Sequence, residues 1–268
     1  MIGLTTIIVV IVVIVVIVVY MSTKSSNESS NDYPMTAVTG YWIINNKHSK
    51  NKFLKWFRNT LKLNCPYVFF GNEETINIVK PLRKNMPTIY INMDISDFYT
   101  YKYKDMIKTH SIHCPSKELN MIWNEKIFLL KKAADINPFN SDYFSWIDAG
   151  ISIFRDRAPP KDIFPNKYKL SYLPTDKIIS CPTDSPNFDH ERSLNDNDYY
   201  HYVSGNYMIH KNIIDNVVKL YSIYLDYYMR KNDWKYTDQV ILTKIYRDNP
   251  NLFYMIGKNY GEIWTELL

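Results

Sequence analysis

The chain has 268 residues, of which 46% are hydrophobic and 22% are charged, with 7 glycines and 3 cysteines. These values exclude a disordered, a collagen-like and a disulfide-rich protein. The formal net charge of +5 comes from 32 basic and 27 acidic residues that are spread along the chain without a long block of either sign, so charge does not indicate nucleic-acid binding.

The first segment, residues 2–21, carries no charged side chain and consists almost entirely of Ile and Val. A helix of this length spans about 30 Å, the thickness of the hydrocarbon core of a bilayer. We therefore predict an uncleaved transmembrane anchor at residues 1–21, in a single-pass type II protein whose body is lumenal or extracytoplasmic. A cleaved signal peptide is the alternative, but its apolar run would be shorter and would end in small residues, whereas this one ends in Tyr20 and Met21.

Residues 22–33 (STKSSNESSNDY) are polar and show no periodicity, which predicts a flexible tether. If this segment is lumenal, Asn27 is a glycosylation acceptor in Asn-Glu-Ser. The remaining residues, 34–268, are predicted to form one globular domain with a core rich in aromatic residues.

The domain begins with alternating strand and helix patterns. We expect strands at 35–44, 67–70 and 88–92, with helices at 47–63 and 73–83 between them. This order predicts right-handed crossovers and a mixed, mostly parallel sheet flanked by helices, an α/β fold. Further along the chain we expect a helix that starts after Ser116, strands at 142–147, 177–181 and 202–210, and helices at 212–229 and 237–246, with long loops in the section 156–200.

Several common motifs are missing from the sequence. It contains no GxGxxG, no P-loop, no GxSxG, no HExxH and no paired CxxC, which removes simple dinucleotide dehydrogenases, P-loop enzymes, serine hydrolases and the common zinc enzymes. Cys65, Cys114 and Cys181 are too few for a disulfide framework, and one bridge at most is possible. The heavy use of Asn, Lys, Ile and Tyr is typical of an AT-rich genome, such as that of a protist or a large DNA virus.

Asp148 is the first candidate functional residue, because it follows the predicted strand 142–147 in the sequence Trp146-Ile147-Asp148-Ala149-Gly150. In open α/β sheets, ligands bind outside the carboxyl ends of the strands, and a carboxylate there can hold a divalent cation that bridges phosphate oxygens. Gly150 would allow the backbone to approach a ligand closely. The alternative is a simple turn after a strand.

Three further positions attract attention, each with a structural alternative. Gly205, between Ser204 and Asn206, interrupts a predicted strand and indicates either a bulge or a close approach to a ligand. Asp238, followed by Gln239, stands at a helix start that Thr237 could cap. Lys126 could reach a phosphate from the predicted helix that also carries Asn124, although a solvated lysine is the commoner use. Side chains of the kinds that bind metals also occur together at Asp189, His190, Glu191 and His201. This section shows little periodicity, however, and a polar loop is the simpler interpretation.

Taken together, several segments resemble the HtrL/YibB family of GT-A-like glycosyltransferases. The segments occur in the family's order, from about residue 35 to the C-terminus: TAVTGYW, CPYVFFGNEE, MIWNEKIFLL, NPFNSDYFSWIDAGI, VSGNYMI and TDQVIL. The resemblance implies a GT-A-like, Rossmann-type fold that binds a nucleotide sugar. It also implies a transferase whose partners are a nucleotide-sugar donor and a glycan, lipid or protein acceptor.

The resemblance further implies roles for individual residues. Asp148 would be the metal or sugar-nucleotide aspartate, with Mn or Mg as the divalent metal, and Asp238 would position or deprotonate the acceptor hydroxyl. The sequence departs from the usual Asp-x-Asp pattern, since WIDAG has a single Asp, and this departure puts metal dependence in doubt. The other expected substrate-binding residues are Thr39 and Tyr41 at the base and ribose, Asn124 and Lys126 near the diphosphate, Gly205 and Asn206 beside the sugar or acceptor, and Trp146, Gly150 and Gln239.

Two rival functions are compatible with the same residues. A membrane-tethered glycan- or protein-binding module would use this fold without turnover, and the single Asp of WIDAG favours it. A metal-dependent phosphoesterase would use Asp148, Asp189 and His190, but the sequence shows no spacing that requires a cluster of carboxylates.

Overall fold

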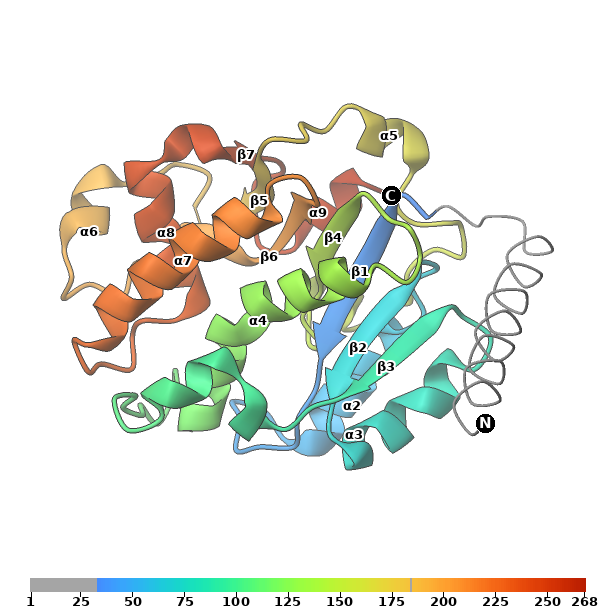
Figure 1. The fold of residues 1–268 in the computed structure, drawn as a ribbon, viewed down its shortest axis with the longest axis horizontal. Coiled ribbons are helices and arrows are strands. Elements are labelled where there is room, and N and C mark those ends of the chain that lie inside the picture. The colour runs from blue at the N-terminus through green and yellow to red at the C-terminus, as the bar shows by residue number, and fades with distance from the viewer. Residues whose placement is uncertain (1–32, 184) are drawn as a thin grey trace, which may run out of the picture. The chain divides into compact units, whose positions relative to one another are not determined.

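A seven-stranded sheet forms the centre of the domain in the computed structural model, which describes residues 33–183 and 185–268 (Figure 1). Residues 33–268 form one compact unit. The predicted membrane anchor and nearly all of the tether lie outside the described residues. Within the described part of the chain, no helix is long and apolar enough to cross a membrane.

The strand order across the sheet is β3-β2-β1-β4-β6-β5-β7. Strand β6 is antiparallel to both of its neighbours, and the other pairings are parallel, which confirms the predicted mixed, mostly parallel α/β sheet. The strands are β1 (Met35–Gly40), β2 (Tyr67–Gly71), β3 (Thr88–Asn92), β4 (Tyr143–Trp146), β5 (Ile178–Pro182), β6 (Val203–His210) and β7 (Phe253–Met255).

Helices cover both faces of this sheet (Figure 1). The α-helices are α2 (Lys50–Thr60), α3 (Glu73–Val79), α4 (Lys117–Ile136), α5 (Lys167–Ser171), α6 (His190–Leu194), α7 (Ile214–Met229), α8 (Asp238–Asp248) and α9 (Glu262–Glu266). Short 3-10 turns are η1 (Lys80–Arg83), η2 (Ile95–Asp97), η3 (Tyr99–Tyr103), η4 (Ser152–Phe154) and η5 (Pro250–Leu252).

Alternating side chains of the strands build two separate cores. In β2, Val68 and Phe70 pack into the core formed with α4, α7 and α8, whereas Tyr67 and Phe69 pack into the core formed with α2, α3 and α9. Successive residues of a strand point to opposite faces, so a strand buried on both faces is mainly apolar. Strand β2 (YVFFG) therefore reads as a continuous apolar run, whereas buried polar residues of β1 and β6, such as Thr39 and Asn206, have hydrogen-bond partners.

Several element boundaries differ from those predicted, among them the ends of β1 and α3. Strand β1 ends at Gly40 rather than residue 44, because the chain turns there and Trp42 donates its indole N–H to the Met93 carbonyl at 2.8 Å. A Cβ at Gly40 would lie 2.5 Å from the Trp42 ring, so this turn needs glycine. Helix α3 ends at Val79 and continues as a 3-10 turn, since Pro81 has no N–H to extend the α-helical pattern.

Helix starts were predicted more accurately than helix ends. Ser116 caps α4 as expected, with its hydroxyl accepting from the Leu119 N–H at 3.2 Å. Thr237 occupies the N-cap position of α8, but its buried hydroxyl makes no hydrogen bond with a described residue, so the predicted side-chain cap is absent.

The section after residue 156 holds more structure than the predicted loops and single strand. Two short helices, α5 and α6, lie in it, and β7 and α9 follow the last predicted helix. Asp189 caps α6 by accepting from the Arg192 N–H, so this residue begins a helix rather than lying in a polar loop. All three cysteines are buried and free, so no bridge forms among them.

The order of the strands places a crevice between β1 and β4. From β1, the chain proceeds outward through β2 and β3 on one side, and from β4 it continues on the other side. The point where the strand order reverses leaves an opening at the carboxyl ends of these two strands, where ligands bind in folds of this kind.

Candidate functional site

A cavity of about 310 Å³ lies at the carboxyl ends of β1 and β4. Its polar centre consists of Lys126, Asp148 and Asp238, which come from α4, from the residues after β4 and from the first turn of α8. Aromatic walls from Trp42, Trp123 and other rings surround this centre. An apolar wall around a few convergent charged groups is the usual composition of a small-molecule site.

Lys126 links the two aspartates. Its ammonium nitrogen Nζ lies 2.9 Å from Asp148 Oδ1 and 2.8 Å from Asp238 Oδ2. It also donates to the Gly205 carbonyl at 3.2 Å. The side chains of Lys126 and Asp238 are 3% and 4% exposed, whereas that of Asp148 is 24% exposed. Asp148 is therefore the carboxylate that faces the cavity most openly.

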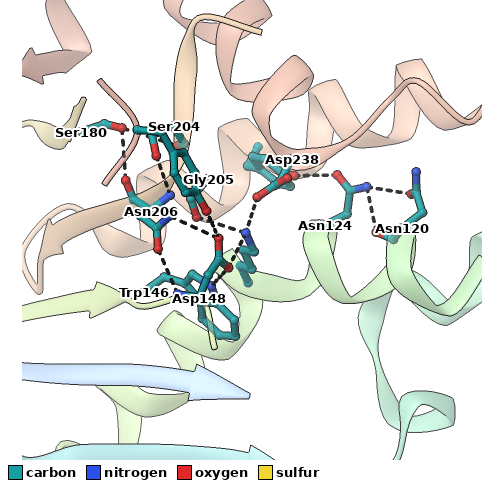
Figure 2. A network of polar contacts seen from close by, with 12 residues as sticks. Asn120, Asn124, Trp146, Asp148, Ser180, Ser204, Gly205, Asn206 and Asp238 are labelled. Carbon is teal, nitrogen blue, oxygen red and sulfur yellow. Dashed lines mark hydrogen bonds and ion pairs between the residues drawn. The ribbon is translucent and has the colours of Figure 1, made fainter. Parts of the chain in front are cut away.

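Asp148 is held by donors on both carboxylate oxygens (Figure 2). Oδ1 accepts from the Trp146 indole at 2.8 Å in addition to the Lys126 ammonium. Oδ2 accepts from the Tyr260 hydroxyl at 2.6 Å and from the Asn206 amide at 3.2 Å. The Asn206 side-chain oxygen in turn accepts from the Asp148 backbone N–H at 2.9 Å, so Asn206 grips this residue at two points.

The environment shifts the pKa values of the two aspartates in opposite directions. Burial alone would raise the pKa of Asp148, but Lys126 and the Tyr260 hydroxyl hold it below its usual value. Burial raises the pKa of Asp238, and Lys126 offsets this only in part. Burial would lower the pKa of Lys126, yet the two carboxylates raise it, so this side chain carries its charge. Pairs of carboxylates with divergent pKa values are typical of sites that divide acid–base roles.

Gly205 gives the ion pair its space. A Cβ at this position would lie 2.6 Å from Asp238 Oδ2 and 2.9 Å from Lys126 Nζ. The pairing of β6 with β5 is also irregular here. Val203 pairs with Pro182 and Tyr207 pairs with Ser180, so the three residues between Val203 and Tyr207 lie opposite a single residue of β5. The bulge proposed at Gly205 is therefore present. The groups that its backbone approaches closely are side chains of the protein, and an approach to a ligand stays a prediction.

Two more cationic side chains line the cavity. Lys47 places its ammonium 4.7 Å from the centroid of the Trp123 ring. Arg155 donates to the Gly150 carbonyl at 2.9 Å and stacks 4.2 Å from the Trp56 ring centroid. With Lys126, three cations face two carboxylates in this cavity, which leaves one net positive charge.

The family model of HtrL_YibB, described as a bacterial protein of unknown function, matches residues 108–265, more than half of the chain. The chain belongs to the HtrL_YibB family. Lys126, Asp148, Gly205, Asp238 and Tyr260 all fall within the matched residues.

No curated protein matches this HtrL_YibB member. Among solved structures, it is similar to the 4-diphosphocytidyl-2C-methyl-D-erythritol synthase from Anaerococcus prevotii DSM 20548, with a TM-score of 0.40 and 12% sequence identity. That alignment covers 88% of this chain and 92% of the other. The likeness is too slight to carry an argument about function.

Most of the site residues expected in this HtrL_YibB chain meet around the cavity. Lining residues among them are Tyr41, Lys126, Trp146, Asp148, Gly150, Asp238 and Gln239. Asn206 and Gly205 lie directly behind them, Asn206 in contact with Asp148 and Gly205 beside Lys126 and Asp238.

Two expected residues serve the fold instead. Thr39 is buried in β1, where its hydroxyl donates to the Ile147 carbonyl at 2.7 Å. Asn124 is buried between helices, where it accepts from the Tyr221 hydroxyl at 2.7 Å and donates to the Tyr236 carbonyl at 3.1 Å.

Sequence reasoning missed several residues of the site. Tyr260 belongs to the turn before α9, an element that no pattern predicted. Lys47 and His48 precede α2 and resemble any polar helix start, and Arg155 lies in a section without a clear pattern. No local pattern indicated these residues, because the β1–α2 connection holds a single charged residue, Lys47, and the other residues lie in irregular segments.

The hydrogen bonds to Asp148 determine whether its carboxylate could also bind the predicted metal ion. An ionised carboxylate has about four lone-pair sites, and four donors occupy those of Asp148. Within residues 33–183 and 185–268, no three His, Cys, Asp or Glu side chains group together as metal ligands would. This donor arrangement does not fit Mn or Mg at Asp148, and the metal itself stays a prediction from the resemblance.

Proposed function

We propose that this chain is a glycosyltransferase that moves a sugar from a nucleotide-sugar donor to a hydroxyl group of a glycan, lipid or protein, on a GT-A-like fold. One observation carries the proposal: two aspartates with divergent pKa values share one buried lysine at the floor of a cavity, at the point where the strand order reverses. A charged, mostly pre-formed site at that place suits a ligand with a phosphate group and several hydroxyls.

The two carboxylates would have different roles in the transfer reaction. Asp238, whose raised pKa makes it the stronger base, takes the proton from the acceptor hydroxyl. The acceptor oxygen then forms a bond to the anomeric carbon, while the bond from that carbon to the diphosphate oxygen breaks and its electrons leave with the nucleoside diphosphate. Asp148 orients Lys126, whose charge would lie beside the diphosphate of the donor.

Donor binding and slow donor hydrolysis by the full-length chain in detergent micelles test the proposal. A panel of nucleotide sugars is compared for the wild type, Asp148→Asn and Asp238→Asn. The matched control is Asp215→Asn, because Asp215 also pairs with a lysine of α4, Lys131, but is 77% exposed. We expect binding of one donor class, weakened about tenfold or more by Asp148→Asn and unchanged in the control.

Hydrolysis separates the roles of the two aspartates. Asp238→Asn should lower the hydrolysis rate by about 10²-fold or more while the donor still binds. Thermal unfolding of each variant shows whether a loss of binding reflects a loss of fold. A folded wild type that binds no donor would contradict the proposal.

A binding module without turnover is the second candidate, and one observation favours it. Both aspartates are already engaged, Asp148 by four donors and Asp238 by Lys126, as they would be in a site that only holds a ligand. Specific glycan binding without donor hydrolysis would support this candidate. The phosphoesterase has weaker support, since Asp189 begins α6 and joins no metal-ligand group among the described residues.

We also propose that residues 1–21, which lie outside the described residues, anchor the protein as a single-pass type II membrane protein. The support is the uncharged Ile- and Val-rich run in the sequence. Such an anchor would place the domain close to lipid-linked or membrane-bound acceptors.

A further inference from the structure

We propose that the ammonium group of Lys126 takes the place of a divalent metal in this site, so that the protein binds the diphosphate of its donor without Mn or Mg. This inference rests on the proposed function. It follows from the position of one buried lysine between two carboxylates and from the donors that already occupy their oxygen atoms.

The Lys126 ammonium lies where a metal would lie. A divalent cation in a transferase site lies between carboxylates and the phosphate oxygens of the leaving group. Here the cation between Asp148 and Asp238 is the Lys126 ammonium, at 2.9 and 2.8 Å from their oxygens. A metal with ligand distances near 2.1 Å would need these oxygens to turn away from Lys126 and from the Trp146 and Tyr260 donors.

Lys126 cannot easily move aside to admit a metal. Its side chain is 3% exposed, and it is fixed by the Gly205 carbonyl as well as by the two aspartates. It projects from the middle of the 20-residue helix α4, whose apolar side chains pack in the main core. To remove this ammonium from between two buried carboxylates would leave both charges unpaired, at a cost of several kcal/mol.

The charges around the cavity suit a diphosphate. A single lysine leaves the pair of carboxylates with one net negative charge, which would repel a diphosphate. Lys47 and Arg155, on the same cavity, reverse that sign and leave the cavity with one net positive charge. Lys47 and Arg155 would therefore donate the charge-assisted hydrogen bonds to the leaving group, whereas Lys126, whose three N–H groups already face Asp148, Asp238 and the Gly205 carbonyl, would contribute its charge.

The experiment measures the affinity of the full-length protein in detergent micelles for UDP, GDP, CDP and ADP, in EDTA and in Mn²⁺. We expect at least one nucleoside diphosphate to bind with an affinity that changes by less than about twofold between the two conditions. Binding in Mn²⁺ that is lost in EDTA would overturn the inference but leave the proposed function standing. The absence of binding in both conditions would overturn both.

The variant Lys126→Ala should bind nucleoside diphosphates in a Mn²⁺-dependent way, unlike the wild type, because it leaves the two carboxylates without their cation. We expect its nucleoside diphosphate affinity in EDTA to fall about tenfold or more and to be partly restored by Mn²⁺. Lys131→Ala is the matched control, since Lys131 lies on the same helix and also pairs with two carboxylates, Asp135 and Asp215, but at the surface. A folded Lys126→Ala variant with wild-type affinity in EDTA would contradict the inference, and the wild-type comparison remains decisive if this variant does not fold.

Discussion

Gly205 and Asp238 approach so closely that a Cβ on the glycine would lie 2.6 Å from Asp238 Oδ2. The two residues come from β6 and α8, and the Lys126 ammonium lies beside both of them. The missing side chain of position 205 is therefore the space in which the buried ion pair forms.

Gly205→Ala should disturb this ion pair. The added methyl group must displace either the Asp238 carboxylate or the Lys126 ammonium, and neither can move into solvent. We expect the free energy of unfolding to fall by about 1–3 kcal/mol, as measured in urea. Gly150→Ala is the comparison, because its methyl group would meet the aromatic rings of Phe53, at 2.9 Å, and Trp56, at 3.4 Å, rather than an ion pair. Equal stability of the Gly205→Ala variant and the wild type would show that the strand can shift to accept the methyl group.

Glu125 should make stability depend on pH. This buried side chain accepts from the backbone N–H groups of Tyr99 and Thr100, yet burial raises its pKa to about 7. The folded state then binds the proton more tightly than the unfolded state, so stability is highest below the unfolded pKa, near 4.5, and falls as pH rises through 7. The loss attributable to this group is at most about 3 kcal/mol.

Glu125→Gln should remove that part of the pH dependence. The measurement is the free energy of unfolding between pH 5 and pH 8, a window that follows from the raised pKa of Glu125. Glu118→Gln, on the exposed side of the same helix, should keep the wild-type slope. If the slopes of the wild type and Glu125→Gln agree, Glu125 does not change its protonation over this range.

Arg83 should be essential for the stability of the β2–β3 side of the sheet. Its buried guanidinium donates to the carbonyls of Leu61, at 2.9 Å, and Cys65, at 2.7 Å, and stacks on the Tyr67 ring. Arg83→Met would fill similar volume but leave these carbonyls without their donor, at a cost of about 3 kcal/mol in unfolding free energy. The exposed Arg58→Met serves as the control, and a difference of less than about 0.5 kcal/mol between the two variants would refute this role.

Residues 2–21 should determine the distribution of the protein between membrane and aqueous fractions. The full chain is expected to sediment with membranes and to resist extraction at alkaline pH, because about 20 apolar residues partition strongly into lipid. Deletion of residues 2–21 should release the protein. Recovery of the intact full chain in the aqueous fraction would exclude a transmembrane anchor.

Much of the fold could be predicted because its elements carry local signals. The strands β2 and β3 were placed almost to the residue, since each is an apolar run bounded by turn residues. The start of α4 was predicted because Ser116 is a good cap. The antiparallel direction of β6 and the presence of β7 were not predicted, because a three-residue strand such as β7 has no periodicity to recognise.

The candidate site was predicted in part. Asp148 and Asp238 stood out because each is a carboxylate at the end or start of a regular element. Asn124 was grouped with Lys126, yet side chains two positions apart on a helix point in directions that differ by about 200°. Asn124 therefore packs against Tyr221, whereas Lys126 reaches the cavity. Tyr260 escaped notice because it becomes part of the site only when the C-terminal turn folds back, where its backbone N–H donates to the Thr183 carbonyl and its hydroxyl to Asp148.

The sequence by itself therefore determined the α/β class, most strands and helices and the two aspartates, because hydrophobic periodicity and caps act between residues that are near in the chain. Only the tertiary structure decided that Lys126 joins Asp148 to Asp238 and that Gly205 leaves room for the pair. Those contacts join residues up to 112 positions apart, and their energies depend on burial, which arises only when the two cores pack around the sheet.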